Sequence, residues 1–113
     1  MSDAHYDCPC MEKCPLHHAM QLIGGKWKVQ IICALCNADT LRYNALRAKL
    51  DGVSNTVLAA ALKELETDGL VTRTVYPEVP VRVEYSPTEE CRRLLPILEQ
   101  LSDWAEARMA NLG

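Results

Sequence analysis

The sequence predicts a mainly α-helical domain with one small β-hairpin, an α+β fold. Two short amphipathic helical patterns, residues 43–50 and 55–68, are joined by a three-residue turn that contains glycine, which is typical of a helix-turn-helix. Two stretches rich in β-branched and aromatic residues follow, residues 70–76 and 81–85, and the proline-containing segment 77–80 separates them as the tip of a hairpin. A helix-turn-helix followed by such a hairpin, or wing, is a winged helix-turn-helix.

The segment before the helix-turn-helix predicts two further helices. Pro15 suits the first position of a helix and Gly24 its end, so the amphipathic stretch between them predicts a first short helix. A second helix is expected to begin at residues 26–28 and to break at residues 37–40, because apolar residues recur at helical spacing between them. Leu41 is expected to begin a strand of one or two residues.

Capping residues mark the later helices. Ser54 is a good N-cap for the helix over residues 55–68, and Gly69 ends that helix. Thr88 is expected to cap a long C-terminal helix, which Pro96 should kink near its start.

The apolar residues of the last helix cover more than one of its faces, which is too much for packing on a domain of this size. They are Leu94, Leu95, Ile97, Leu98, Leu101, Trp104, Ala105, Met109 and Leu112. A second copy of the chain would cover the surplus, so we expect a fold that is dimeric through its terminal helices, mainly the last and aided by the first.

Length and composition predict one compact domain. The chain has 113 residues, of which 49% are apolar, and we divide it into a flexible, cysteine-containing arm, residues 1–13, and a single domain, residues 14–113. The sequence contains neither an apolar run near the roughly 20 residues of a membrane span nor the order of a signal peptide. We therefore expect a cytoplasmic protein without membrane contact, whose six cysteines are kept reduced.

The charge is unevenly distributed along the chain. The net charge is −3, which by itself argues against nucleic acid as a partner. Residues 26–82, however, contain eight bases against six acids, whereas residues 1–25 contain one base against three acids and residues 83–113 three against six. A local positive face is what phosphate contacts need, so the composition permits DNA binding without indicating it.

Five motifs connect the chain with a known family. They are Cys14-Pro15, Ile23-Gly24-Gly25-Lys26-Trp27, Leu41-Arg42-Tyr43-Asn44, Leu62-Lys63-Glu64-Leu65-Glu66-x-Asp68-Gly69-Leu70-Val71 and Tyr76-Pro77-x-Val79-Pro80-x-Arg82-Val83-Glu84-Tyr85. In order and spacing these motifs resemble the HxlR-type family of bacterial winged helix-turn-helix regulators, over roughly residues 14–110. The resemblance implies a winged helix-turn-helix fold, a homodimer and binding to double-stranded DNA.

The second helix of a helix-turn-helix lies in the major groove, and its N-terminal residues reach the base edges. The candidate contacts on this helix are Ser54, Asn55, Thr56 and Lys63. Asparagine can pair bidentately with adenine, and threonine can donate, accept or touch a thymine methyl group. The buried stripe is expected to be Leu58, Ala61, Leu62 and Leu65. The exposed Ala59 and Ala60 offer little hydrogen-bonded readout, so DNA shape and wing contacts are expected to provide more of the specificity.

Three arginines are candidates for contacts to phosphate or to the minor groove. Arg42 and Arg47 flank the first helix of the helix-turn-helix, and Arg82 stands beside the wing tip. The alternative is that these are solvated surface charges. The family-like context favours the DNA role for Arg42 and Arg82.

Cys14 is the candidate redox sensor. It precedes Pro15 and therefore occupies the N-cap of the first helix, where unpaired amides and the helix dipole stabilise a thiolate. In relatives of the family a cysteine at the matching position often senses oxidants or electrophiles, so the resemblance implies such a compound as the inducer. The alternative is a buried, inert thiol.

Cys8 and Cys10 lie outside the family motif and leave three interpretations open. They could resolve an oxidised Cys14 as a disulfide, or they could remain idle on the arm. Together with Cys14 and His17 or His18 they could also bind zinc, although the spacing matches no common zinc pattern closely. We favour the redox role and assign no metal or other cofactor.

The remaining cysteines are expected to be structural. The pair Cys33 and Cys36 lies inside a helical pattern and not at a helix N-terminus, and Cys91 lies near acidic residues that oppose thiolate formation. No nucleophile–base set and no phosphate-binding glycine loop is recognisable, so we do not expect an enzyme. The alternatives to a redox-responsive regulator are a metal-responsive regulator on the same fold and a thiol or interaction protein that does not bind DNA.

Overall fold

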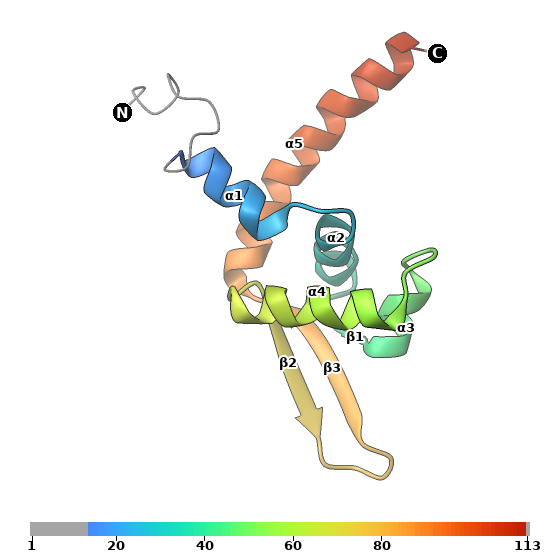
Figure 1. Ribbon diagram of the computed structural model, residues 1–113. Coiled ribbons are helices and arrows are strands. Elements are labelled where there is room, and N and C mark those ends of the chain that lie inside the picture. The colour runs from blue at the N-terminus through green and yellow to red at the C-terminus, as the bar shows by residue number, and fades with distance from the viewer. Residues whose placement is uncertain (1–13, 113) are drawn as a thin grey trace.

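The computed structural model describes residues 14–112. The elements in order are α1 (Pro15–Ile23), α2 (Lys28–Ala38), β1 (Leu41–Arg42), α3 (Tyr43–Ala48), α4 (Asn55–Thr67), β2 (Val71–Tyr76), β3 (Arg82–Pro87) and α5 (Glu89–Leu112). The predicted winged helix-turn-helix is confirmed, with α3 and α4 as the helix-turn-helix and β2 and β3 as the wing (Figure 1).

Three predicted ends were wrong by two residues, and one of them is that of α3, which ends at Ala48 and not at residue 50. The break expected at residue 37 begins at Asp39, because the backbone N–H of Asp39 still donates to the Leu35 carbonyl and its φ of 71° then turns the chain out of α2. The second wing strand continues to Pro87, two residues beyond the predicted end at Tyr85. A capping hydrogen bond decides where α2 ends, and the pairing of Ser86 and Pro87 with β2 decides where β3 ends.

A short additional strand anchors the wing to the helix-turn-helix. The sheet is antiparallel with the order β1-β3-β2, so β3 lies in the middle. In β1, Leu41 pairs with Tyr85 and Arg42 with Glu84. Because β1 leads directly into α3, this pairing fixes the base of the wing beside the start of the helix-turn-helix.

The core lies where α2, α4 and the base of the sheet meet. Its fully buried side chains are Ile31, Ile32, Leu35, Leu46, Leu58, Leu62, Leu65 and Cys91. The predicted buried stripe of α4 is confirmed, since Leu58, Ala61, Leu62 and Leu65 are all buried. This stripe holds α4 against the core and leaves its opposite face exposed.

Thr88 joins the end of α4 to the start of α5. Its Oγ1 accepts a hydrogen bond from the Cys91 backbone N–H (3.2 Å), which confirms the predicted cap of α5, and donates one to the Gly69 carbonyl (2.8 Å). The Thr88 backbone N–H also donates to the Leu70 carbonyl (3.1 Å). One residue thus closes the base of the wing.

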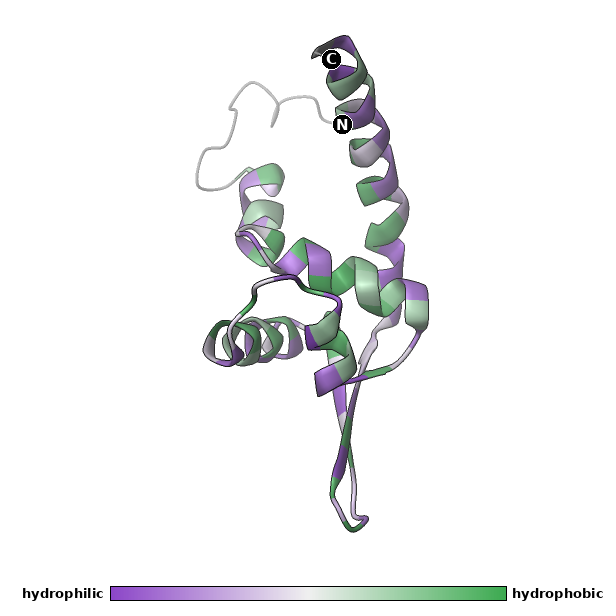
Figure 2. Ribbon diagram, turned by 90° about the vertical axis from the view of Figure 1, so that its right-hand side faces the viewer, coloured by the Kyte–Doolittle hydropathy of each residue, from purple (hydrophilic) through white to green (hydrophobic). Residues whose placement is uncertain are grey.

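Two elements project from the body in opposite directions, the wing at one end and the C-terminal half of α5 at the other (Figures 1 and 2). Apolar side chains remain exposed on the terminal helices; those on α1 are Leu16 and Met20, and those on α5 are Ile97, Leu101, Trp104 and Met109. Within residues 14–112, every helix is too short or too polar to span a membrane.

Candidate nucleic-acid interface

The exposed face of α4 gathers the residues predicted to contact bases. Ser54 is the N-cap of α4, and its Oγ accepts a hydrogen bond from the Val57 backbone N–H (3.1 Å). Asn55, Thr56 and Lys63 are exposed on the helix that follows. The four candidates therefore lie on one element, at and beyond its N-terminus, as a recognition helix requires.

Tyr43 adds a contact to this face that the sequence analysis missed. Its hydroxyl donates to the Asn55 side-chain Oδ1 (3.0 Å) and lies 3.2 Å from the Asn55 backbone carbonyl. The phenol, at the start of α3, thus orients the amide that is a candidate for reading adenine. In the sequence, only the hydroxyl of Tyr43, which a phenylalanine would lack, could have signalled this polar role.

A salt bridge joins α4 to the start of α2. Lys28 Nζ, at the start of α2, lies 2.6 Å from Glu64 Oε1 on α4. The Lys28 side chain is only 12% exposed, so its charge serves the packing of the two helices. Glu64 is the exposed partner, and it lines one depression together with Lys28 and the candidate contact Thr56.

The structure brings Arg42 and Arg82 to one hollow between α3 and the wing. This hollow has a volume of about 460 Å³, and its lining includes both arginines together with Tyr43, Asn44 and Val81. The antiparallel register explains the proximity, since Arg42 lies opposite Glu84 in β1 and Arg82 is two residues before Glu84 in β3. Arg42 is exposed, whereas Arg82 is half-buried.

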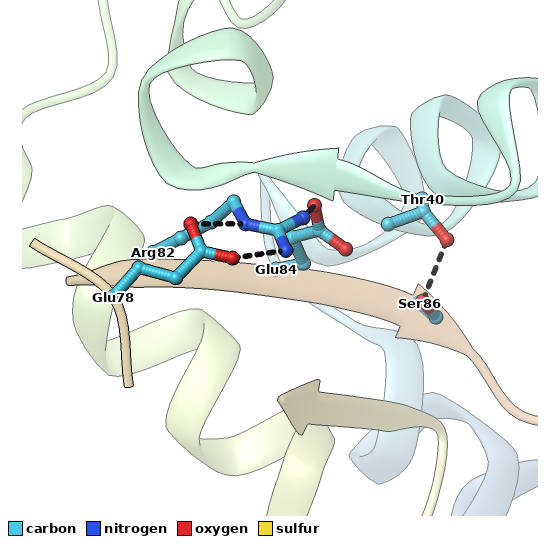
Figure 3. Close-up of polar contacts among 5 residues, drawn as sticks. All are labelled: Thr40, Glu78, Arg82, Glu84 and Ser86. Atoms are coloured by element: carbon cyan, nitrogen blue, oxygen red, sulfur yellow. Dashed lines mark hydrogen bonds and ion pairs between the residues drawn. The ribbon is translucent and has the colours of Figure 1, made fainter. Parts of the chain in front are cut away.

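Arg82 is held by two carboxylates, which Figure 3 shows, and by one aromatic ring. Its Nε and Nη2 donate to the two oxygens of Glu78 (3.3 and 2.8 Å), and its Nη1 donates to Glu84 (2.6 Å). The guanidinium also lies over the ring of Tyr76, the cross-strand partner of Arg82, at 3.8 Å from the centroid. The same close-up shows Thr40 and Ser86, whose hydroxyl oxygens are 2.9 Å apart. This hydrogen bond links the residue before β1 to β3.

Arg47 lies apart from the other two arginines. It is exposed in the last turn of α3 and lines a separate depression along the turn of the helix-turn-helix, together with Asn44 and Ser54. This depression also includes Asp51, so the charge there is mixed. The three arginine candidates therefore occupy two places, both adjoining the recognition helix.

Cys14 occupies the predicted N-cap of α1, with Pro15 at the first helical position. Its carbonyl accepts a hydrogen bond from the His18 backbone N–H (3.1 Å), and its side chain is only 5% exposed. His17 is half-buried and His18 exposed in the same turn. Cys8 and Cys10 lie outside the described residues.

The other cysteines form a cluster between α2 and α5. Cys36 and Cys91 are buried with their Sγ atoms 4.0 Å apart, and Cys33 is half-buried. Burial raises the pKa of the Cys91 thiol to about 12, helped by the neighbouring Cys36. Burial, Cys36 and Glu99 likewise raise the pKa of Cys33. The predicted packing role of Cys36 and Cys91 is confirmed. Within residues 14–112 there is no group of three or more His, Cys, Asp or Glu residues that could hold a metal ion.

An exposed recognition helix beside a wing, with Arg42 and Arg82 in the hollow between α3 and the wing, defines the class of winged helix-turn-helix regulators that bind DNA. The HxlR-like helix-turn-helix family matches residues 22–112, and the chain belongs to this family.

Curated relatives and solved structures agree with this assignment. The chain is 43% identical over 97 residues to the HTH-type transcriptional regulator BH0655 of Halalkalibacterium halodurans, covering 86% of each chain. Its fold is similar to that of the redox regulator HypR in reduced form, with a TM-score of 0.81, 38% identity and coverage of 87% of this chain and 96% of that one. It is also similar to reduced YodB of Bacillus subtilis, with a TM-score of 0.74, 34% identity and coverage of 82% and 91%. The protein is a transcriptional regulator of the helix-turn-helix type.

Proposed function

We propose that the protein binds a palindromic DNA operator as a homodimer, through α4 and the wing, and that modification of Cys14 by an oxidant or electrophile changes this binding. One observation supports the DNA part above all others: the exposed N-terminal face of α4 and the hollow lined by Arg42 and Arg82 adjoin each other through α3. Base contacts in the major groove and phosphate contacts beside it need this arrangement.

The position of Cys14 supports the regulatory part. A thiolate at a helix N-cap is stabilised by the helix dipole, which favours reaction with electrophiles. The side chain is only 5% exposed, as an inert thiol would be, so a reaction at Cys14 requires movement of the start of α1 to admit the reagent and to accommodate the product. Among the similar structures, HypR occurs in oxidised and reduced forms and YodB in reduced and diamide-treated forms, which makes redox regulation the favoured proposal for this chain.

The homodimer would convert movement of α1 into a change on DNA. Leu16 and Met20 of α1 are about half-exposed, and α5 exposes the apolar set described above. If these faces form the dimer contact, a shift of α1 alters the distance between the two α4 helices, which must match the ~34 Å between successive major-groove faces.

The test is the binding of the protein to duplex DNA from its own upstream region, with and without diamide. Diamide takes two electrons and two protons from a pair of thiols, which become a disulfide. We expect oxidation to change the affinity of the wild type and of Cys33→Ser, the control at a half-buried thiol of α2, but not that of Cys14→Ser.

Three other outcomes would contradict the proposal in different ways. DNA binding that is unchanged by oxidation would show that the protein is a regulator without a thiol switch. One zinc per reduced chain, lost in Cys14→Ser, would favour the metal-responsive alternative. No salt-sensitive binding to any duplex would favour a protein that does not read DNA.

A further inference from the structure

Two carboxylates of the wing neutralise its basic side chain Arg82. Of the five N–H donors on the Arg82 guanidinium, the bidentate pair Nε and Nη2 faces Glu78, and Nη1 faces Glu84. A bidentate fork of this kind is the geometry with which arginine binds a phosphate group. Glu78 therefore occupies, with two oxygens, the edge of Arg82 that a DNA phosphate would use.

The two carboxylates differ in how firmly they are placed. Glu84 is in the middle of β3 and its side chain is 18% exposed, whereas the Glu78 side chain is 53% exposed in the segment between the wing strands. The ring of Tyr76 further holds the guanidinium from its face. Displacement of Glu78 would therefore leave Arg82 positioned by Glu84 and Tyr76, with its bidentate edge open.

The local charge also favours a competition. Glu78, Arg82 and Glu84 are the charged residues of the segment 76–84, which has two acids and one base and so a net charge of −1. Arg42, which lines the same hollow as Arg82, brings the group to neutrality, so no net positive charge attracts the DNA backbone while Glu78 stays in place. Its hydrogen bonds from Arg82, assisted by the charges of Arg82 and Arg42, hold the pKa of the Glu78 carboxyl below its usual value, so the carboxylate remains ionised at neutral pH.

We infer that Glu78 competes with DNA phosphate for the Arg82 guanidinium, and that Glu84 and Tyr76 keep this guanidinium in place when Glu78 is displaced. The inference rests on the proposed DNA-binding function and adds a negative determinant of affinity to it. Glu78 thus lowers the affinity of the wing for DNA of any sequence. Arg82 becomes available to a phosphate only when other protein–DNA contacts hold the DNA against the wing.

The experiment measures dissociation constants for duplex DNA by fluorescence anisotropy at one fixed salt concentration. We expect Glu78→Gln, which keeps the shape of the side chain but removes its charge, to bind about 3- to 10-fold more tightly than the wild type. In an Arg82→Ala background the same substitution is expected to give no gain in affinity, because Glu78 then has no guanidinium to occupy. Glu90→Gln is the matched control, since Glu90 also pairs with an arginine, Arg93, at 2.8 Å on the exposed surface of α5.

Each contrary result has a distinct meaning. An equal gain from Glu78→Gln with and without Arg82 would reveal a general charge effect and overturn the inference. Unchanged or weaker binding of Glu78→Gln would overturn it too, and the weaker case would show that Glu78 positions Arg82 for DNA. In both cases wild-type binding would leave the proposed function standing. A wild type that binds no duplex would overturn the proposed function and this inference together.

Discussion

Single side chains cap the starts of α4 and α5. Ser54 Oγ satisfies the backbone N–H of Val57 at the start of α4, and Thr88 Oγ1 does the same for Cys91 at the start of α5. Both hydroxyls replace hydrogen bonds that the first turn of a helix lacks. Because α4 begins at the cap, Ser54 also determines where Asn55 and Thr56 stand.

Removal of the cap is expected to destabilise the domain. Ser54→Ala should lower the free energy of unfolding by about 1 kcal/mol, since the Val57 N–H then loses its partner. Urea denaturation followed by circular dichroism measures this difference. Ser54→Asp is the control, because aspartate is an equally good N-cap and should retain most of the stability. Equal losses in both variants would show that the cap is not the cause.

The buried thiol of Cys91 predicts a loss of stability at high pH. Its pKa is raised from 9.0 to about 12 by burial, so the unfolded chain ionises this thiol at a lower pH than the folded one. Its contribution to stability is therefore complete below about pH 9 and is lost as the pH rises toward 12. We expect the free energy of unfolding, measured with reductant present, to fall less steeply over this range in Cys91→Ala. The same slope in both proteins would contradict the prediction, since lysines and tyrosines titrate equally in each.

At the scale of elements, the pairing of β1 with β3 brings the wing to the helix-turn-helix. Arg42 ends β1 and is also the N-cap of α3, so it belongs to both parts. Two backbone partners, Tyr85 and Glu84, hold β1 against the middle strand. The proposed phosphate contact of Arg42 follows from this position between the two reading elements.

Arg42→Ala is expected to weaken DNA binding similarly for all sequences and to reduce the slope of log affinity against log salt by about 1, because one phosphate contact is lost. Anisotropy titrations over a range of salt concentrations measure both quantities. Lys49→Ala is the matched control, since Lys49 is an exposed base at the other end of α3. Equal effects of the two substitutions would show that Arg42 acts only through its charge and does not contact a phosphate.

At the scale of the whole molecule, α5 projects from the body (Figure 2). Its apolar side chains Ile97, Leu101, Trp104 and Met109 are exposed. Leu101 and Trp104 are 57% and 62% exposed, and Ile97 precedes Leu101 by one helical turn. Exposed apolar surface of this kind marks a contact with another chain. A two-fold contact here would present two α4 helices to one side of a DNA duplex.

Charged residues on this face are expected to separate the proposed dimer. Leu101→Glu combined with Trp104→Glu should give a monomer by analytical ultracentrifugation, because carboxylates cannot be buried in an apolar contact without a large cost. The monomer should also bind operator DNA at least about 10-fold more weakly, since it reads one half-site. Ser102→Glu, exposed on the same helix, should remain a dimer. A wild type that is already monomeric would remove the dimer from the proposal.

The sequence by itself determined the order and type of the elements, because caps, glycines and the change from helical to alternating periodicity are local signals. It also located α4, the N-cap position of Cys14 and the packing role of Cys36 and Cys91. Local patterns could not show that β1 pairs with β3, that the Tyr43 hydroxyl reaches Asn55 or that Arg82 is held by Glu78 and Glu84. Strand register decides the pairing of β1 with β3, and packing decides the contact of Tyr43 with Asn55, because these residues are distant along the chain. Glu78 and Glu84 are near Arg82 in sequence, but only the conformation of the wing determines which edge of the guanidinium each carboxylate meets.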